Sequence, residues 1–183
     1  KLGHENSIIN ALVNLSETYN FLAKLEEEYN LLERALLLDK AKQSIEQLAA
    51  VYENLGDYYY QKKQYQQSLL NYQQNHDYVL QMGNKYALAG SFSMLAQVNT
   101  KLNQNDKALG YILQAEKVAE EVGARADLKQ IYLTRARLEQ QLGNNKQAAE
   151  YFSRALTLTD SLFKVETSEK IADVEAKYQN EKK

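Results

Sequence analysis

One segment indicates the architecture of this chain most directly, namely Tyr52-Glu53-Asn54-Leu55-Gly56-Asp57-Tyr58-Tyr59. A bulky residue and a small residue of this segment return at an offset of 40 residues, so that repeats begin near residues 9, 49, 89 and 129. The bulky column holds Leu12, Tyr52, Phe92 and Tyr132. The small column holds Ser16, Gly56, Ala96 and Ala136. Four copies of one pattern predict an array of a single structural unit.

The second half of each repeat has its own columns of small and large residues. They hold Ser68, Ala108 and Ala148, then Leu32, Tyr72, Ile112 and Phe152, and then Ala35, Ala115 and Ala155. Small residues at the crossing of two antiparallel helices receive large side chains from the partner helix. One such pair cannot bury its apolar faces alone, so we expect successive pairs to stack on one another.

Composition favours helices along the whole chain. The 183 residues include no proline and only seven glycines, which removes the strongest helix breakers almost everywhere. Gly83 and Gly123 lie where a second helix should end in a left-handed cap. We expect helices near residues 6–22, 25–40, 44–62, 65–81, 85–102, 105–121, 125–142 and 145–160, and a ninth helix over 164–182.

Along the first half of a repeat the residue types come in the order bulky, Leu, small, Tyr, and along the second half in the order small, aromatic, Ala. This order resembles that of the tetratricopeptide repeat (TPR) family over residues 9 to about 168. The resemblance implies an all-α protein, an α-α superhelix of four helix pairs with a C-terminal helix. It divides the chain into four repeats over 1–168 and a capping or connector helix over 169–183. The departures from the family pattern are Glu28 and Asn75 in place of Ala, Asn99 and Glu139 in place of Tyr, and Arg135 in place of Leu.

The tail resembles the end of the sensor region in bacterial TPR-containing sensor histidine kinases. The residues that carry this likeness are Asp160-Ser-Leu-Phe163 and Lys177-Tyr178-Gln-Asn-Glu181-Lys-Lys183. The resemblance implies a lever toward an output domain and favours the extracytoplasmic side of a membrane-bound parent protein, with a cytoplasmic location as the alternative. A helix that only caps the last repeat explains the tail equally well. Because the chain opens with Lys1, we expect it to be part of a longer protein.

Charge and composition exclude several function classes. The net charge is −2 and neither sign runs in blocks, so nucleic acid and anionic membranes are poor partners for these residues. Cysteine is absent, and the only histidines, His4 and His76, have no neighbours at metal-ligand spacing. No phosphate loop or nucleophile motif occurs. We expect no catalytic residue, no metal and no cofactor, and therefore no enzyme within this sequence.

The TPR resemblance also places a concave groove along the first helix of each repeat. Carried over position by position, with Glu17 and Asn20 from the first repeat, the groove candidates are Glu53, Asn54, Asp57, Tyr60, Gln61, Gln97, Thr100, Lys101, Thr134, Arg137, Gln140 and Gln141. Glu53 and Asp57 stand where members that hold a chaperone C-terminal carboxylate have Lys and Asn. That binding mode is therefore not expected here.

Tyrosine is abundant, with 14 residues. The repeat columns place Tyr52, Tyr59, Tyr65 and Tyr72 in the core. Tyr58 and Tyr60 fall outside those columns and are predicted to be exposed contact residues, because tyrosine offers a large contact area with few rotatable bonds. We further expect Tyr60, Lys101 and Arg137 to be exposed in the groove. An alternative is that the two cations pair with Asp57 or other groove acids.

These observations predict a domain that binds a protein or peptide in its groove and passes the change along the tail helix to an output domain. The alternative is a TPR assembly scaffold or co-chaperone with no signalling output. The two hypotheses differ in the sequence that they require after Lys183 in the full-length protein. The amphipathic tail is also suited to forming a dimer through the C-terminal helix.

Overall fold

The computed structural model describes residues 2–22, 24–38 and 44–181, and this part of the chain contains helices and no strand. The first four helices are α1 (Leu2–Phe21), α2 (Leu25–Leu37), α3 (Ile45–Gln61) and α4 (Tyr65–Met82). They are followed by α5 (Lys85–Lys101), α6 (Asn105–Val122), α7 (Arg125–Gln141) and α8 (Asn145–Glu181). The chain is an all-α superhelix, as the sequence predicts.

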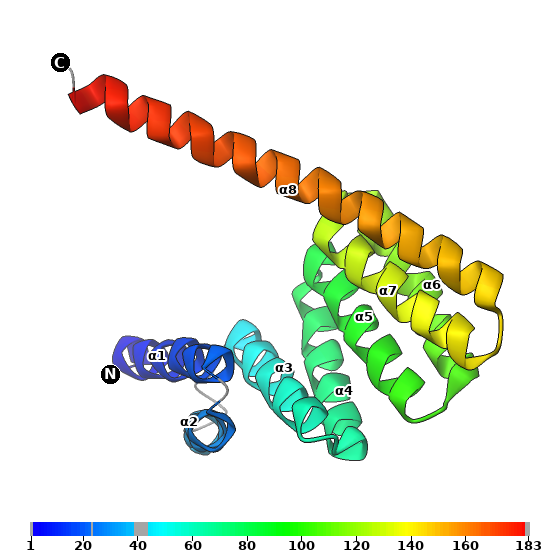
Figure 1. Cartoon of the computed structure of the whole chain (residues 1–183). Coiled ribbons are helices and arrows are strands. Elements are labelled where there is room, and N and C mark those ends of the chain that lie inside the picture. Colours follow the sequence, from blue (N-terminus) through cyan, green and yellow to red (C-terminus); the bar gives the residue numbers. More distant parts are fainter. Residues whose placement is uncertain (1, 23, 39–43, 182–183) are drawn as a thin grey trace.

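The helices form four pairs that stack in chain order. Each first helix packs against the second helix of its own pair, and each second helix packs against the first helix of the next pair. Figure 1 shows the resulting array, with α1 and α2 at one end and α7 and α8 at the other. Three clusters of buried side chains follow one another through the stack, and Tyr111 packs against two of them.

The columns of small residues lie at the crossings inside each pair. Ala96, Ala108 and Ala136 are fully buried. At Gly56 an added Cβ atom would lie 2.3 Å from Cδ1 of Tyr72 on the partner helix, which is closer than any real Cβ contact. The small residue of α3 and the large residue of α4 therefore fit together as the repeat pattern predicts.

Local signals fix the ends of the helices. Ser44 and Gln47 form a reciprocal capping box at the start of α3, and Asn84 accepts from two backbone N–H groups at the start of α5. Gly83 and Gly123 end α4 and α6 with left-handed φ values of 65° and 69°. The expected boundaries are correct to within one or two residues from α3 to α7, while residues 39 and 40, expected at the end of α2, lie outside the described residues.

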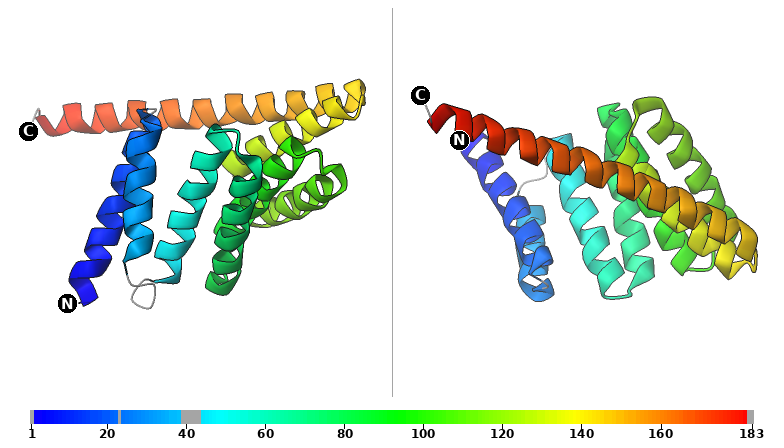
Figure 2. Two further views of the ribbon diagram at one scale, coloured as in Figure 1. Left: turned by 90° about the horizontal axis from the view of Figure 1, so that it is seen from below. Right: turned by 45° about the horizontal axis from the view of Figure 1, so that its top comes forward.

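The tail is continuous with the last repeat, so the expectation of a separate ninth helix was wrong. Helix α8 runs without a break from Asn145 to Glu181, and Figure 2 shows it projecting beyond the helix pairs. No glycine or proline interrupts the sequence over this range, so nothing ends the helix. Within the described residues, no helix combines the length and the apolar character needed to cross a membrane.

Tyr58 is buried rather than exposed, which corrects the prediction for this residue. Its ring stacks on Tyr29 with centroids 4.9 Å apart, and the ammonium of Lys62 lies 5.8 Å from the ring centroid. Tyr58 follows Val51 by seven residues, so both face helix α2 of the preceding pair. Of the tyrosines predicted for the core, Tyr72 is buried, and the three others are half-buried.

Candidate functional site

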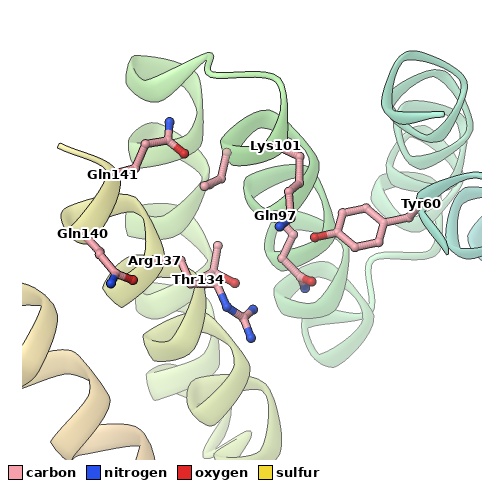
Figure 3. Close-up of a pocket in the computed structure, with 8 residues that line it drawn as sticks. Tyr60, Gln97, Lys101, Thr134, Arg137, Gln140 and Gln141 are labelled. Atoms are coloured by element: carbon pink, nitrogen blue, oxygen red, sulfur yellow. The ribbon is translucent and has the colours of Figure 1, made fainter. Parts of the chain in front are cut away.

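A cavity of about 340 Å³ opens between α3, α5 and α7, the first helices of three successive pairs. Figure 3 shows the side chains that converge on it from these helices. Its lining consists of Tyr60, Gln97, Thr100, Lys101, Thr134, Arg137, Gln140 and Gln141. All of these residues belong to the groove candidates that the repeat columns select, so residues spread over 82 positions of sequence gather around one space.

Tyr60 forms the wall of the cavity on the α3 side. The ring is half-buried rather than exposed as expected, because it packs edge-on against Tyr65, with centroids 5.4 Å apart. Figure 3 shows the ring reaching from α3 with its hydroxyl group directed toward Gln97 of α5. Burial and the neighbouring Tyr65 raise the pKa of the Tyr60 hydroxyl, so at neutral pH this group is a hydrogen-bond donor as well as an acceptor.

The two cations of the cavity, Lys101 and Arg137, are exposed. Within the described part of the chain, neither has a carboxylate within ion-pair distance. Asp57, the acid that could have paired with them, instead accepts a hydrogen bond of 2.5 Å from the Tyr72 hydroxyl. The alternative that Lys101 and Arg137 serve only as internal partners of groove acids therefore does not hold, and both cations face the cavity with unused donors.

The polar residues between the cations differ in what they offer a ligand. The hydroxyl groups of Thr100 and Thr134 bond to the carbonyl oxygens of Ala96 and Gln130 in their own helices. Both threonines are buried, and their hydrogen-bonding capacity toward a ligand is already partly used. The side-chain amide of Gln141 donates to Asn105 at 2.8 Å.

The amides of Gln97 and Gln140 remain available for a ligand. Gln97 is half-buried and Gln140 is exposed, and no hydrogen bond joins either side chain to another described residue. Each can donate and accept. The cavity thus offers two cations, two free amides and the Tyr60 hydroxyl, whereas the polar groups of Thr100, Thr134 and Gln141 already make hydrogen bonds.

An acidic region of the same surface lies toward the N-terminal pairs. Burial raises the pKa of Glu53 to about 7, with Asp57, Glu17 and Asp127 adding repulsion in that order. The Glu53 side chain nevertheless keeps contact with solvent. Burial also raises the pKa of Asp57, against the opposing effect of the hydrogen bond from Tyr72.

Asp127 is a member of this acidic region that the sequence columns missed. It lies in the first turn of α7, just before the fourth repeat begins at residue 129, and so outside the groove positions carried over from the family. Its influence on Glu53, a residue 74 positions earlier, depends on how the helix pairs stack. No local pattern in the sequence signals that proximity.

The other sequence candidates are placed outside the cavity. Asn54 donates to the Ser16 hydroxyl at 3.5 Å, and Gln61 is exposed in the last turn of α3. Asn20 donates to the buried carboxyl group of Glu28 at 2.8 Å, so it supports the first helix pair. These positions share the groove columns but do not line the cavity with the other candidates.

Side chains that could carry chemistry are used in packing. His76 is half-buried, contacts the Ser91 hydroxyl at 2.9 Å and lies against the Phe92 ring. Glu139 is buried and paired with Arg135 at 2.6 Å. Among the residues that the structure describes, no group of three or more His, Cys, Asp or Glu side chains could hold a metal ion. The acidic region around Glu53 is therefore better described as an electrostatic surface than as a metal centre.

Comparison with known proteins agrees with this architecture. Residues 129–161 match the family model described as Tetratricopeptide repeat. No curated protein sequence matches the chain. Among solved structures, BtubC from P. vanneervenii is similar with a TM-score of 0.69 and 17% identity, over 86% of this chain and 64% of that one.

Two further structures show the same fold. Aspartyl phosphate phosphatase F from Bacillus subtilis has a TM-score of 0.73 at 15% identity, over 86% of this chain and 42% of that one. MamA has a TM-score of 0.61 at 18% identity, over 85% of this chain and 81% of that one. The chain thus spans less than two thirds of the first two structures. Its fold is a helical solenoid of tetratricopeptide type, and its fourth repeat carries the sequence pattern of that family.

Proposed function

We propose that this chain is an interaction domain that binds a peptide or protein segment along α3, α5 and α7. The observation that supports this most strongly is the cavity in which Lys101 and Arg137 stand without acidic partners. Exposed cations with unused donors are suited to a carboxylate, which they bind through charge-assisted hydrogen bonds. The domain supplies shape and charge for recognition and performs no reaction.

The charges of the surface indicate the polarity of the ligand. The acidic region around Glu53 and Asp57 lies on α3, whereas the two cations lie on α5 and α7. A ligand segment with an acidic group in the cavity and a basic group toward α3 complements both regions. Tyr60 interacts electrostatically with both Asp57 and Arg137, and it offers an aromatic face and a hydroxyl group to the segment.

Selection from a random-peptide display library against the wild-type chain provides the test. We expect the selected peptides to share an acidic residue, and their affinity for the Arg137→Ala variant to fall about tenfold, as for a central interface arginine. Lys107→Ala, which removes an exposed cation on α6, is the matched control and should bind like the wild type. Equal affinity for all three proteins would contradict the proposed site.

For the whole protein, we propose that ligand binding is passed through residues 169–183, the connector expected from the sequence, to an output domain. The unbroken course of α8 from the fourth pair to Glu181 supports a stiff connection. A sensory role in a membrane-bound parent, with this domain on the extracytoplasmic side, is part of this proposal.

The competing function is an assembly scaffold without signalling, which needs the groove but not the connector. The gene sequence downstream of Lys183 separates the two functions. A membrane span and then a kinase or DNA-binding domain support signalling, and a stop codon directly after Lys183 contradicts it.

A further inference from the structure

The repeat offset gives the groove surface a gradient of charge from α3 to α7. Asp57, Gln97 and Arg137 lie 40 residues apart and occupy the same position of three successive first helices. The formal charge at this position therefore changes from negative on α3 through neutral on α5 to positive on α7. Lys101, one helical turn after Gln97, adds a positive charge on α5. The cavity is therefore positively charged at its α5 and α7 walls.

The lining of the cavity is rich in hydrogen-bond donors. Tyr60 offers a hydroxyl group from α3, Lys101 an ammonium group from α5 and Arg137 a guanidinium group from α7. Figure 3 shows Tyr60 on one side of the cavity and Arg137 on the other. The free amides of Gln97 and Gln140 add donors on the α5 and α7 walls. Among the described residues, the lining includes no Asp or Glu, so donors from three helices surround the space.

The Tyr60 hydroxyl shows which charge dominates in the cavity. Burial raises the pKa of this group most, followed by the neighbouring Tyr65. Arg137 lowers the same pKa, and its effect is larger than the opposing effect of Asp57. The positive charge on α7 thus outweighs the charge of Asp57 at a side chain that comes from α3. The cavity therefore favours an anion beside the hydroxyl group.

Charge and geometry distinguish the two kinds of anion that a peptide side chain can carry. A carboxylate is planar and presents one charge on two oxygen atoms, so it matches only one of the two cations. A phosphorylated serine, threonine or tyrosine carries a charge of about −1.5 to −2 at neutral pH and three strong acceptor oxygens. These oxygens point in tetrahedral directions, which suits donors that approach from three helices. The lining therefore matches a phosphate group more completely than a carboxylate.

We propose that this cavity binds a phosphorylated side chain of the ligand segment, whose two negative charges are shared by Lys101 and Arg137. The inference rests on the proposed function and specifies the acidic group that the groove recognises. Arg137 suits this role because its guanidinium can donate two parallel hydrogen bonds to a phosphate group. Lys101 adds a point charge from α5, and the amides of Gln97 and Gln140 supply neutral donors.

The acidic region restricts the rest of the segment. Glu53 and Asp57 lie on α3, so they repel further negative charges of a ligand that extends in this direction. A single phosphate group concentrates two charges within the cavity, whereas a pair of acidic residues spreads them along the peptide chain. The preferred segment therefore has one phosphorylated residue in the cavity and a Lys or Arg toward α3.

Two peptide libraries with the same random flanks, one with phosphoserine and one with glutamate fixed at the central position, provide the test. Each library is captured on the immobilised wild-type chain, and the enriched sequences are synthesised for affinity measurements. The phosphoserine peptides should bind about tenfold more tightly than the best glutamate peptides, because a dianion strengthens the charge-assisted hydrogen bonds. The same peptides remade with unmodified serine should lose this binding.

Two charge-removing variants assign the contacts. Arg137→Gln should lower the affinity for the glutamate peptides about tenfold and for the phosphoserine peptides about a hundredfold, because the doubled charge loses more. Lys101→Gln should also weaken the phosphoserine peptides more than the glutamate peptides, because a carboxylate needs only one of the two cations. Lys107→Gln, at an exposed cation of α6, is the matched control and should bind both like the wild type. Lys101 and Arg137 are exposed, so circular dichroism should show folded variants.

The outcomes separate this inference from the function on which it rests. Glutamate peptides that bind as tightly as phosphoserine peptides would overturn the phosphate assignment and leave the proposed peptide binding in place. Equal losses of phosphoserine affinity in Arg137→Gln and Lys107→Gln would overturn it as well. Free O-phosphoserine that competes as strongly as a whole phosphopeptide would assign the cavity to small phosphorylated compounds instead of a peptide. Failure of both libraries to bind would contradict the phosphate site and the peptide function together.

Discussion

At Gly56 the backbone of α3 runs directly against the Tyr72 ring, and this single contact shows why the repeat requires a small residue. A Cβ atom would lie 2.3 Å from the ring. We therefore expect Gly56→Ala to lower the free energy of unfolding by about 1–3 kcal/mol, the usual effect of overpacking. Urea unfolding measures the change.

Gly110→Ala is the matched control, because an added Cβ atom at Gly110 meets nothing within 4 Å. The site is inside α6, where alanine favours the helix by about 0.5–1 kcal/mol over glycine. The two substitutions should therefore shift stability in opposite directions. Equal shifts would mean that helix propensity, rather than the contact with Tyr72, decides the effect at Gly56.

The turns inside the repeats carry a second residue-scale signal. Lys63, Asn103 and Gly143 lie 40 residues apart, and all three have positive φ values, of 60°, 58° and 81°. The left-handed region is strained for lysine and unstrained for glycine. We expect Lys63→Gly to raise the free energy of unfolding by about 0.5–1 kcal/mol and Gly143→Ala to lower it by about 1 kcal/mol. Thermal melts that move in the opposite directions would contradict this interpretation of the turns.

Sequence reasoning at this scale succeeded where a column recurs and failed where a residue looked isolated. The small residues at the helix crossings could be predicted because four copies agree. Tyr58 was misassigned because only the columns inside a pair were considered. Its place beside Tyr29 of the preceding pair is explained by the helix face that it shares with Val51 and Leu55, which are also buried. The sequence therefore contained the signal, at spacings of three and four residues.

At the scale of whole helices, α8 differs most from the expectation. A ninth helix was expected from residue 164, although the absence of glycine and proline after Gly143 also allowed a rigid connection from the fourth repeat into the tail. Side chains of Thr157, Thr159 and Thr167 bond back to carbonyl groups one turn earlier. An uninterrupted run of helix-compatible residues simply continues the helix.

Packing of α7 against α8 gives a prediction at the same scale. Ala148 is buried at the helix crossing in the column of Ser68 and Ala108. We expect Ala148→Leu to lower the free energy of unfolding by about 1–3 kcal/mol, because a close crossing accommodates a larger side chain only by shifting the helices. Ala126→Leu, at an exposed position of α7, should change it by less than about 0.5 kcal/mol. Chemical unfolding of both variants provides the measurement, and an unchanged Ala148→Leu variant would show that the column lies outside the crossing.

For the whole molecule, the four-pair architecture could be predicted because contacts in a solenoid join only neighbouring units. The groove candidates could be predicted because the repeats place equivalent positions on one surface. The sequence could not predict which of these candidates meet in one cavity, because that depends on the angles between helix pairs. Tyr60 from α3 therefore joins Arg137 from α7, while Asn54 on the same helix as Tyr60 stays apart.

The acidic region gives a pH prediction at this scale. The pKa of Glu53 is raised from 4.5 to about 7 in the folded chain, so the folded state holds this proton more tightly than the unfolded state. Protonated Glu53 therefore contributes to the free energy of unfolding. This contribution is fully present below pH 4.5 and is lost as the pH rises toward 7. Asp57→Asn removes a repelling charge and should lower the pKa of Glu53, which a carbon-13 NMR titration measures directly. A pKa that does not fall would mean that burial alone is responsible.

The most direct measurement of the central claim is NMR mapping of a peptide selected on the wild-type chain. If the groove binds the peptide, the side-chain amide signals of Gln97 and Gln140 should shift on titration. Those of Gln67 and Gln114, which are exposed on second helices, should stay in place. Shifts confined to Gln67 and Gln114, with Gln97 and Gln140 unmoved, would show that the ligand binds elsewhere.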